Sequence, residues 1–115
     1  MAIMDHYHAH LYYNEDNLGE ATALAEEVAK TFEVKVGRLH QKPVGPHPTW
    51  SCQLSCDTDV FKELIPWLMV NRGSVDVFVH GVSGDDLRDH TEYVMWLGNS
   101  YPLKLDMFRR SSTPS

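Results

Sequence analysis

Apolar and polar positions alternate along this chain with two different periods, which predicts strands interleaved with helices. Residues 7–13, YHAHLYY, combine aromatic and other strand-favouring side chains, so we expect a first strand there. Between Glu15 and Phe32, apolar residues recur every three or four positions, which is typical of an amphipathic helix. Asn14 or Asp16 can cap the start of this helix.

Short apolar segments and a second helix follow. Residues 33–41 and 49–55 are predicted as the second and third strands, separated by a stiff loop rich in proline and glycine. Helical spacing of apolar residues resumes over 57–68, and Pro66 predicts a kink or a restart within that helix. Residues 75–80, VDVFVH, are predicted as a fourth strand.

The C-terminal part adds elements to this pattern. We expect a turn at residues 83–86, a short helix over 87–97, and an edge strand within the apolar tail 103–108. The order β-α-β-β-α-β predicts an α+β fold of the ferredoxin-like type, an antiparallel sheet with helices on one face, plus a C-terminal helix and tail. A chain of 115 residues favours a single domain over 1–115.

Strand alternation predicts which side chains lie on the sheet face away from the helices. Successive residues of a strand point to opposite faces. In the first strand, the more polar set is His8, His10 and Tyr12, so we assign that set to the open face. In the fourth strand, the valines would face the helices and leave His80 on the open face. Because the first and fourth strands run antiparallel in this fold, His80 is predicted to lie close to His8.

These histidines have the spacing of metal ligands. His8 and His10 stand about 7 Å apart at Cα on one strand face, so both imidazoles can converge on one ion. Imidazole suits zinc, copper, iron and nickel. A third ligand from the neighbouring strand, His80, would leave coordination positions open, as a catalytic metal requires. The alternative is that His8 and His10 are surface histidines without a metal.

Further residues are candidates for a pocket beside the histidines. The loop Gly45-Pro46-His47-Pro48 presents His47 as a general acid or base, unless its prolines merely stiffen a connection. Arg72 can hold a substrate carboxylate or cap a helix C-terminus. We expect His90 to reach the cleft while its neighbour Asp89 stays in solvent. The aromatic and amide candidates for the pocket wall are Trp50, Gln53, Trp67, Phe78 and Trp96.

Composition and charge argue against several other classes of protein. The net charge of −6 disfavours nucleic-acid and anionic-membrane partners. The sequence lacks an apolar run of the roughly 20 residues that span a bilayer, and its N-terminus does not read as a signal peptide. On one strand, Cys52 and Cys56 would stand about 13 Å apart, too far for a disulfide. We therefore expect reduced thiols and a cytoplasmic protein.

Several motifs, taken in order, resemble the DOPA 4,5-dioxygenase family. The segments are YHAHLYY, GPHPTWSCQ, RGSVDVFVHGVSGDDLRDH and WLGNSYPLKLD, and they run over nearly the whole chain. The resemblance implies a small ferredoxin-like protein, often a homodimer, that uses molecular oxygen to open a catechol ring such as DOPA beside its two hydroxyls. It also implies ferrous iron as the cofactor. The histidines at positions 8, 10, 47, 80 and 90 match those of the family.

The residues and the resemblance together predict a metal-dependent extradiol dioxygenase. Fe(II), or zinc or another divalent ion in its place, would be held by the three histidines at positions 8, 10 and 80. His47 or His90 would take a catechol proton and later return it. Arg72, Trp50 and Gln53 are the predicted substrate-binding residues.

Some alternatives stay open at this point. Asp76 or Asp85 could replace one histidine ligand, because two histidines and one carboxylate are a common non-haem iron set. Gly81 stands where the family usually has proline, and we expect it to loosen the loop after His80. Two other functions also fit the pattern: a non-catalytic metal- or small-ligand-binding module, and an interaction domain that covers its open sheet face with a partner.

Overall fold

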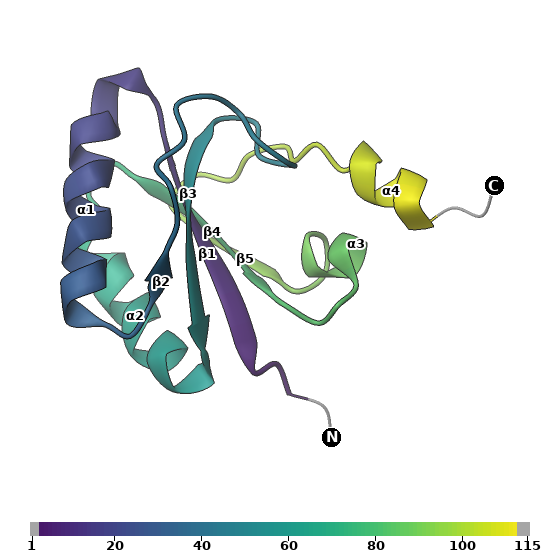
Figure 1. Cartoon of the computed structure of the whole chain (residues 1–115), viewed down its shortest axis with the longest axis horizontal. Helices are drawn as coiled ribbons and strands as arrows, with labels where there is room; N and C mark the ends of the chain where they lie inside the picture. Colours follow the sequence, from purple (N-terminus) through teal and green to yellow (C-terminus); the bar gives the residue numbers. More distant parts are fainter. Residues whose placement is uncertain (1–2, 113–115) are drawn as a thin grey trace.

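The computed structural model describes the chain from residue 3 to residue 112, and there one sheet carries helices on both of its faces (Figure 1). The strands are β1 (His6–Tyr13), β2 (Lys35–Val36), β3 (Trp50–Asp57), β4 (Asp76–Gly81) and β5 (Val94–Leu97). The helices are η1 (Glu15–Asn17), α1 (Leu18–Thr31), α2 (Thr58–Asn71), α3 (Asp86–Asp89) and α4 (Asp106–Ser112).

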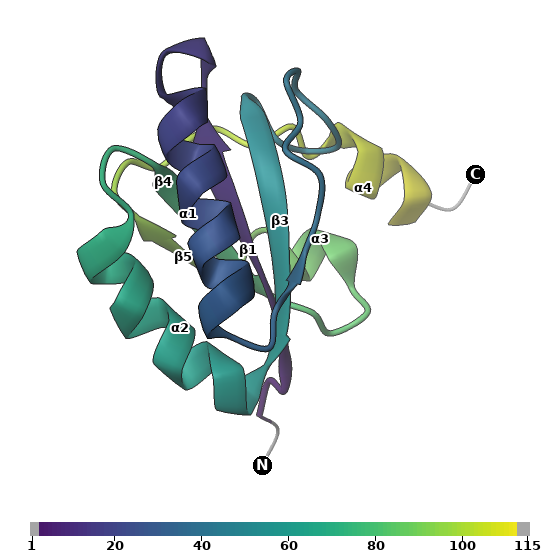
Figure 2. The ribbon, with the colours of Figure 1, turned by 60° about the vertical axis from the view of Figure 1, so that its left-hand side comes forward.

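The sheet has the order β2-β3-β1-β4-β5, and all neighbouring strands are antiparallel. The first four strands, together with α1 and α2, form a ferredoxin-like arrangement, which confirms the predicted fold. Strand β5 extends the sheet beyond β4. β1 therefore lies at the centre, hydrogen-bonded to β3 on one side and to β4 on the other. Figure 2 shows α1 and α2 packed together across one face.

Both long helices form because their apolar residues recur at helical spacing. In α1 the buried positions are Ala21, Leu24, Ala25 and Val28, and they pack on the valines of β4 and the apolar side of β1. Helix α2 begins after Asp57, whose carboxylate accepts a hydrogen bond from the backbone of the first turn. The helix continues through Pro66, which is exposed on its outer side.

Two predictions for the C-terminal part are wrong. Residues 87–97 were predicted as one helix, whereas α3 ends at Asp89 and Val94–Leu97 form β5. The open edge of β4 pairs with this strand-favouring VMWL segment, and the pairing provides hydrogen-bond partners for backbone N–H and C=O groups of both strands. The tail 103–108 was predicted as an edge strand, but β5 already occupies that edge, and the tail leads into helix α4.

The predicted second strand is shorter than expected. Only Lys35 and Val36 pair as β2, although the chain stays alongside β3 for several more residues. The backbone N–H of Gly37 donates to Gln53 O at 2.8 Å, and that of His40 donates to Ser51 O at 3.0 Å. Cys52 and Cys56 of β3 are both buried free thiols, as predicted.

The second face of the sheet is covered by the C-terminal segment. Helices α3 and α4 lie on the side opposite α1 and α2 (Figure 1). Lys104 N donates to Pro46 O at 2.8 Å, which joins this segment to the loop before β3. Tyr12 and Phe78 on this face are almost fully buried. Within residues 3–112 we find no helix long and apolar enough to cross a membrane.

Candidate metal centre

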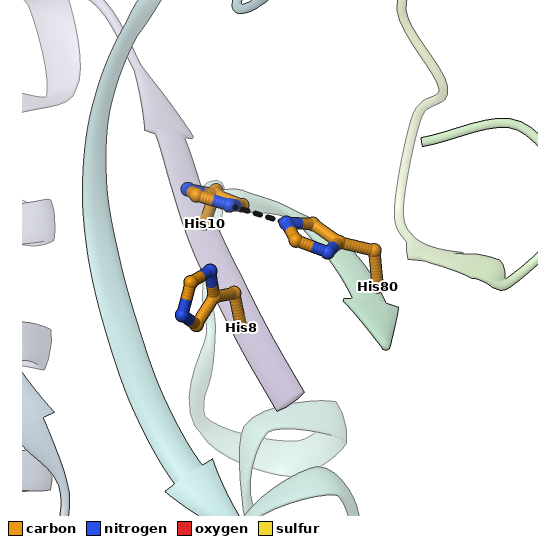
Figure 3. A group of neighbouring side chains, drawn as sticks. All are labelled: His8, His10 and His80. Atoms are coloured by element: carbon orange, nitrogen blue, oxygen red, sulfur yellow. Dashed lines mark hydrogen bonds between the residues drawn. The ribbon is translucent and has the colours of Figure 1, made fainter. Parts of the chain in front are cut away.

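The pairing of β1 with β4 brings three histidines together on the face away from α1 and α2. His8 lies directly opposite His80 in the antiparallel register, and His10 is two residues further along the same face. One ring nitrogen from each of the three lies within 4.8 Å of those of the others (Figure 3). Nε2 of His10 is 3.0 Å from Nε2 of His80. The predicted proximity of His8 and His80 is confirmed.

The arrangement fits a divalent metal ion with nitrogen ligands. Two nitrogens that each stand about 2.1 Å from one ion, at right angles, are about 3.0 Å apart. That is the separation of the two Nε2 atoms of His10 and His80. His80 Nδ1 donates a hydrogen bond to Gly81 O at 2.8 Å, which leaves the lone pair on Nε2. His80 is thereby oriented as a metal ligand would be.

Burial keeps these imidazoles uncharged. Desolvation lowers the pKa of His80 to about 4, although its hydrogen bond to Gly81 acts in the opposite direction. Burial, followed by the neighbouring His47, holds the pKa of His10 well below its ordinary value. Burial and then His6 lower the pKa of His8. Neutral imidazole is the form that binds a metal, so the three are ready to do so at neutral pH.

A cavity of about 240 Å³ opens over these histidines. Its lining is His8, His10, Pro46, His47, Gln53, His80, Val82, Asp86, Asp89, His90 and Phe108. The hollow is slightly smaller than the pockets of roughly 300 Å³ or more that take drug-sized ligands, so it suits one aromatic ring with a short substituent. A hollow of about 270 Å³ near Met4 and Phe61 is lined mainly by apolar side chains. We place the site at the smaller hollow because polar groups converge there.

The two histidines predicted to move protons both line this cavity. His47 is buried, its ring centroid is 4.2 Å from that of His10, and Tyr12 Oη is 2.6 Å from its Nδ1. Burial, then the nearby His90 and His80, lower the pKa of His47 to about 4. The ring of His90 lies 4.2 Å from that of His80, and His90 Nδ1 is 2.7 Å from Asp86 O.

The predicted substrate-binding residues do not all meet at the cavity. Gln53 lines it, from β3 opposite His10. Trp50 lies on the other face of the sheet, where it packs against Tyr13 and the main core. Arg72 is also elsewhere: its Nη1 donates to Val75 O at 3.1 Å and forms an ion pair with Asp76 at 3.7 Å.

The other aromatic candidates divide between the two faces of the sheet. Trp67 packs against Phe32 in the main core. Phe78 and Trp96 contact each other on the histidine face, with ring centroids 4.6 Å apart. The ring of Phe78 is also stacked near that of His10, with centroids 5.9 Å apart.

Neither carboxylate alternative joins the histidine group. Asp76 accepts hydrogen bonds from Asn99 N at 2.9 Å and from the Tyr101 hydroxyl at 2.6 Å, so its oxygens are occupied. Asp85 is exposed and caps α3 through Arg88 N. Among the described residues, the group of side chains able to hold a metal consists of histidines.

Two expectations about the loop after β4 are wrong. Asp89 was expected in solvent, but it is 2% exposed and accepts hydrogen bonds from the backbone and hydroxyl of Ser83. Gly81 was expected to loosen the loop after His80, but it is the last residue of β4. Its N–H donates to Tyr93 O at 2.9 Å and its carbonyl accepts from His80, so it helps to fix the histidine.

Comparison with known proteins places this chain in a family of dioxygenases, which agrees with a candidate metal site. The model of the Dopa 4,5-dioxygenase family matches residues 7–107, nearly the whole chain. The chain belongs to the Dopa 4,5-dioxygenase family. The matched range contains all five histidines of the cavity and all three members of the candidate metal site.

Individual relatives of this dioxygenase family show how far the similarity extends. A DOPA 4,5-dioxygenase of Amanita muscaria is 31% identical over 108 residues, which are 86% of this chain and 47% of that protein. An uncharacterized 21.2 kDa protein of Botryotinia fuckeliana is 32% identical over 116 residues, covering 90% of this chain and 63% of that protein. The chain thus spans only part of the length of these curated relatives.

A solved structure matches the fold over almost its full length. The crystal structure of a candidate dioxygenase from Nostoc punctiforme superposes with a TM-score of 0.91 and 36% identity. The match covers 95% of this chain and 95% of the other. The fold of this chain is therefore shared with a protein that is described as a dioxygenase.

Proposed function

We propose that this protein is a ferrous-iron-dependent extradiol dioxygenase that opens the ring of a catechol with molecular oxygen. The observation that carries the proposal is the convergence of His8, His10 and His80 under a ring-sized cavity, in a chain of the Dopa 4,5-dioxygenase family. Zinc or another divalent ion in the same site is the alternative metal. DOPA is the substrate that the family name suggests.

The proposed reaction breaks one ring carbon–carbon bond beside the two hydroxyls. Both oxygen atoms of dioxygen enter the ring-opened product, so the atoms balance without an external reductant. His8, His10 and His80 would hold iron through ring nitrogens, and bound iron would supply a Lewis acid and a template for substrate and oxygen. Three protein ligands would leave other coordination positions open for substrate and oxygen.

The remaining cavity residues orient the substrate and move its protons. The ring centroid of His47 is 4.2 Å from that of His10, and the ring centroid of His90 is 4.2 Å from that of His80, so both can reach a substrate bound over these ligands. Phe108 packs on His90, with centroids 4.6 Å apart, and narrows the cavity with apolar surface. The amide of Gln53 supplies a hydrogen-bonding group from the β3 side.

A direct test is to load the metal-free protein with Fe(II) under nitrogen and then add catechols in air. We expect oxygen uptake and a yellow ring-opened product in equal amounts for at least one catechol. If fully loaded protein consumes no oxygen with any of a broad set of catechols, the enzyme proposal is wrong. Tight zinc uptake with every coordination position filled by protein would instead favour the metal-binding module.

The position of Arg72 leads to a prediction about substrate recognition. Because Arg72 is bound to Val75 and Asp76 outside the cavity lining, Arg72→Gln should leave the ratio of KM values for carboxylated and uncarboxylated catechols within about twofold of wild type. The variant should instead lose about 1–3 kcal/mol of unfolding free energy, since buried Asp76 loses a partner. A KM that rises tenfold only for carboxylated catechols would show that Arg72 binds the substrate.

The proposal also includes a homodimer in the cytoplasm, as the family resemblance implies. Two free, buried thiols, Cys52 and Cys56, agree with a reducing compartment. Met69 and Val70 expose apolar surface on α2 that a second copy could cover.

A further inference from the structure

The two histidines that flank the metal ligands have different hydrogen-bond partners on Nδ1. A neutral imidazole carries its proton on one nitrogen and a lone pair on the other, and the partner of one nitrogen fixes the state of both. His90 Nδ1 lies 2.7 Å from the backbone carbonyl oxygen of Asp86. A carbonyl can only accept, so His90 Nδ1 carries the proton and its Nε2 keeps the lone pair.

His47 is in the opposite situation. Its Nδ1 lies 2.6 Å from the hydroxyl of Tyr12, which is 1% exposed. Tyrosine is protonated at neutral pH, and a buried O–H needs an acceptor. Within the described part of the chain, the hydrogen-bond partner of this hydroxyl is His47 Nδ1. Tyr12 therefore donates, and the proton of His47 is on Nε2.

The surrounding aromatic residues hold Tyr12 in this orientation. Its ring centroid lies 5.0 Å from that of Tyr101 and 5.7 Å from that of Trp96, both in edge-on contacts. Tyr101 is itself fixed, because its hydroxyl donates to Asp76 Oδ2 at 2.6 Å. The loop that carries His47 is tied down on the other side by the bond from Lys104 N to Pro46 O.

From these contacts we infer that the two histidines divide the proton transfers, His90 as acceptor and His47 as donor, and that Tyr12 is the positioning residue for His47. The roles rest on the proposed dioxygenase function, whereas the tautomers rest on the hydrogen bonds alone. The mere presence of two histidines in a cavity leaves these roles interchangeable, and their partners distinguish them.

The proton balance of this division is simple. The O–H bond of a catechol hydroxyl breaks, and its proton forms an N–H bond at His90 Nε2. Later the N–H bond at His47 Nε2 breaks, and that proton forms an O–H bond on an oxygen of the product. In the same step the O–H bond of Tyr12 breaks and its proton forms an N–H bond at His47 Nδ1, so His47 stays neutral. His90 then releases its proton to solvent, His47 Nε2 takes one up, and His47 Nδ1 returns its proton to Tyr12, so all three groups regain their starting states. Neither histidine is oxidised or reduced.

The test is to observe the tautomers directly in the full chain, metal-free and loaded with diamagnetic zinc. Two-bond nitrogen–proton NMR correlations should show the proton on Nε2 of His47 and on Nδ1 of His90. In Tyr12→Phe, His47 should populate both tautomers while His90 is unchanged. Tyr13→Phe is the matched control, because it removes a hydroxyl that donates to the backbone carbonyls of His40 and Ser51 on the other face of the sheet, and it should leave His47 as in wild type.

Kinetics of the iron-loaded variants supply a second readout. Tyr12→Phe should lower kcat by about tenfold or more with little change in KM, since a donor that is wrongly protonated slows proton transfer and not binding. A wild-type His47 with its proton on Nδ1, or an identical pattern in Tyr12→Phe, would overturn the inference, and the wild-type spectrum decides this even if the variant does not fold. The assigned tautomers in a protein that cleaves no catechol would overturn the enzymatic roles and uphold the positioning by Tyr12.

Discussion

His80→Ala and His10→Ala should each abolish stoichiometric metal binding and reduce ring cleavage to background. The two Nε2 atoms are 3.0 Å apart and belong to the three-histidine group, so either change removes a direct ligand. Removing a hydrogen-bond partner of a metal ligand typically lowers metal affinity by about 10–100-fold, so removing the ligand itself should lower metal affinity by more than about 100-fold. Metal titration of the purified variants, followed by metal analysis after gel filtration, measures the effect.

His6→Ala is the matched control for these variants. His6 lies on the same strand and the same face, two residues before His8, but its Nε2 is bonded to Ser55 Oγ at 3.0 Å and it is outside the group. We expect His6→Ala to bind metal and cleave catechols as wild type does. Equal losses in His6→Ala and His80→Ala, or none in either, would mean that the metal is held elsewhere.

The metal-free protein should lose several kcal/mol of unfolding free energy between pH 6.5 and pH 4. The pKa values of His47 and His80 fall from 6.5 to about 4 on folding, mainly through burial. Between these values the unfolded chain binds more protons than the folded one, so stability is lost as the pH falls. Each shift corresponds to about 3 kcal/mol, and the loss is complete only below the folded-state pKa. Small domains have about 5–15 kcal/mol in total, so acid unfolding is expected within this window.

Urea unfolding in the presence of a chelator, at several pH values from 7 to 4.5, measures this effect. Carboxylates also titrate near the acidic end, so the histidine contribution is isolated with His47→Gln, which should lose less stability than wild type over the same range. If wild type and His47→Gln show the same dependence on pH, His47 is not the buried neutral group that the structure indicates.

The local sequence pattern predicts much of the fold and of the candidate site. Alternation in β1 set His8, His10 and Tyr12 on one face, and helical spacing set the buried positions of α1. The same alternation in β3 separates two of the predicted substrate-binding residues. Trp50 and Gln53 are three residues apart on one strand, so they point to opposite faces and cannot both line one pocket.

Other features depended on contacts between distant parts of the chain. Val94–Leu97 became a strand because the edge of β4 was free to pair with it. Asp89 is buried because Ser83 donates twice to its carboxylate, and the hydrogen bond between Tyr12 and His47 joins residues 35 positions apart. None of these contacts leaves a periodic trace in the sequence, because each depends on where a loop folds back onto the sheet.

The sequence by itself determined the α+β fold, the central strand and the face on which the histidines stand, because backbone periodicity and side-chain alternation are local properties. The tertiary structure alone decided which groups surround that face. In the folded chain Arg72 and Trp50 lie outside the cavity, and α3 and α4 lie on the face of the sheet that carries the histidines. His47 and His90 have different hydrogen-bond partners there. Protonation and ligand geometry follow from such contacts over a few ångströms, and only the folded chain brings those atoms together.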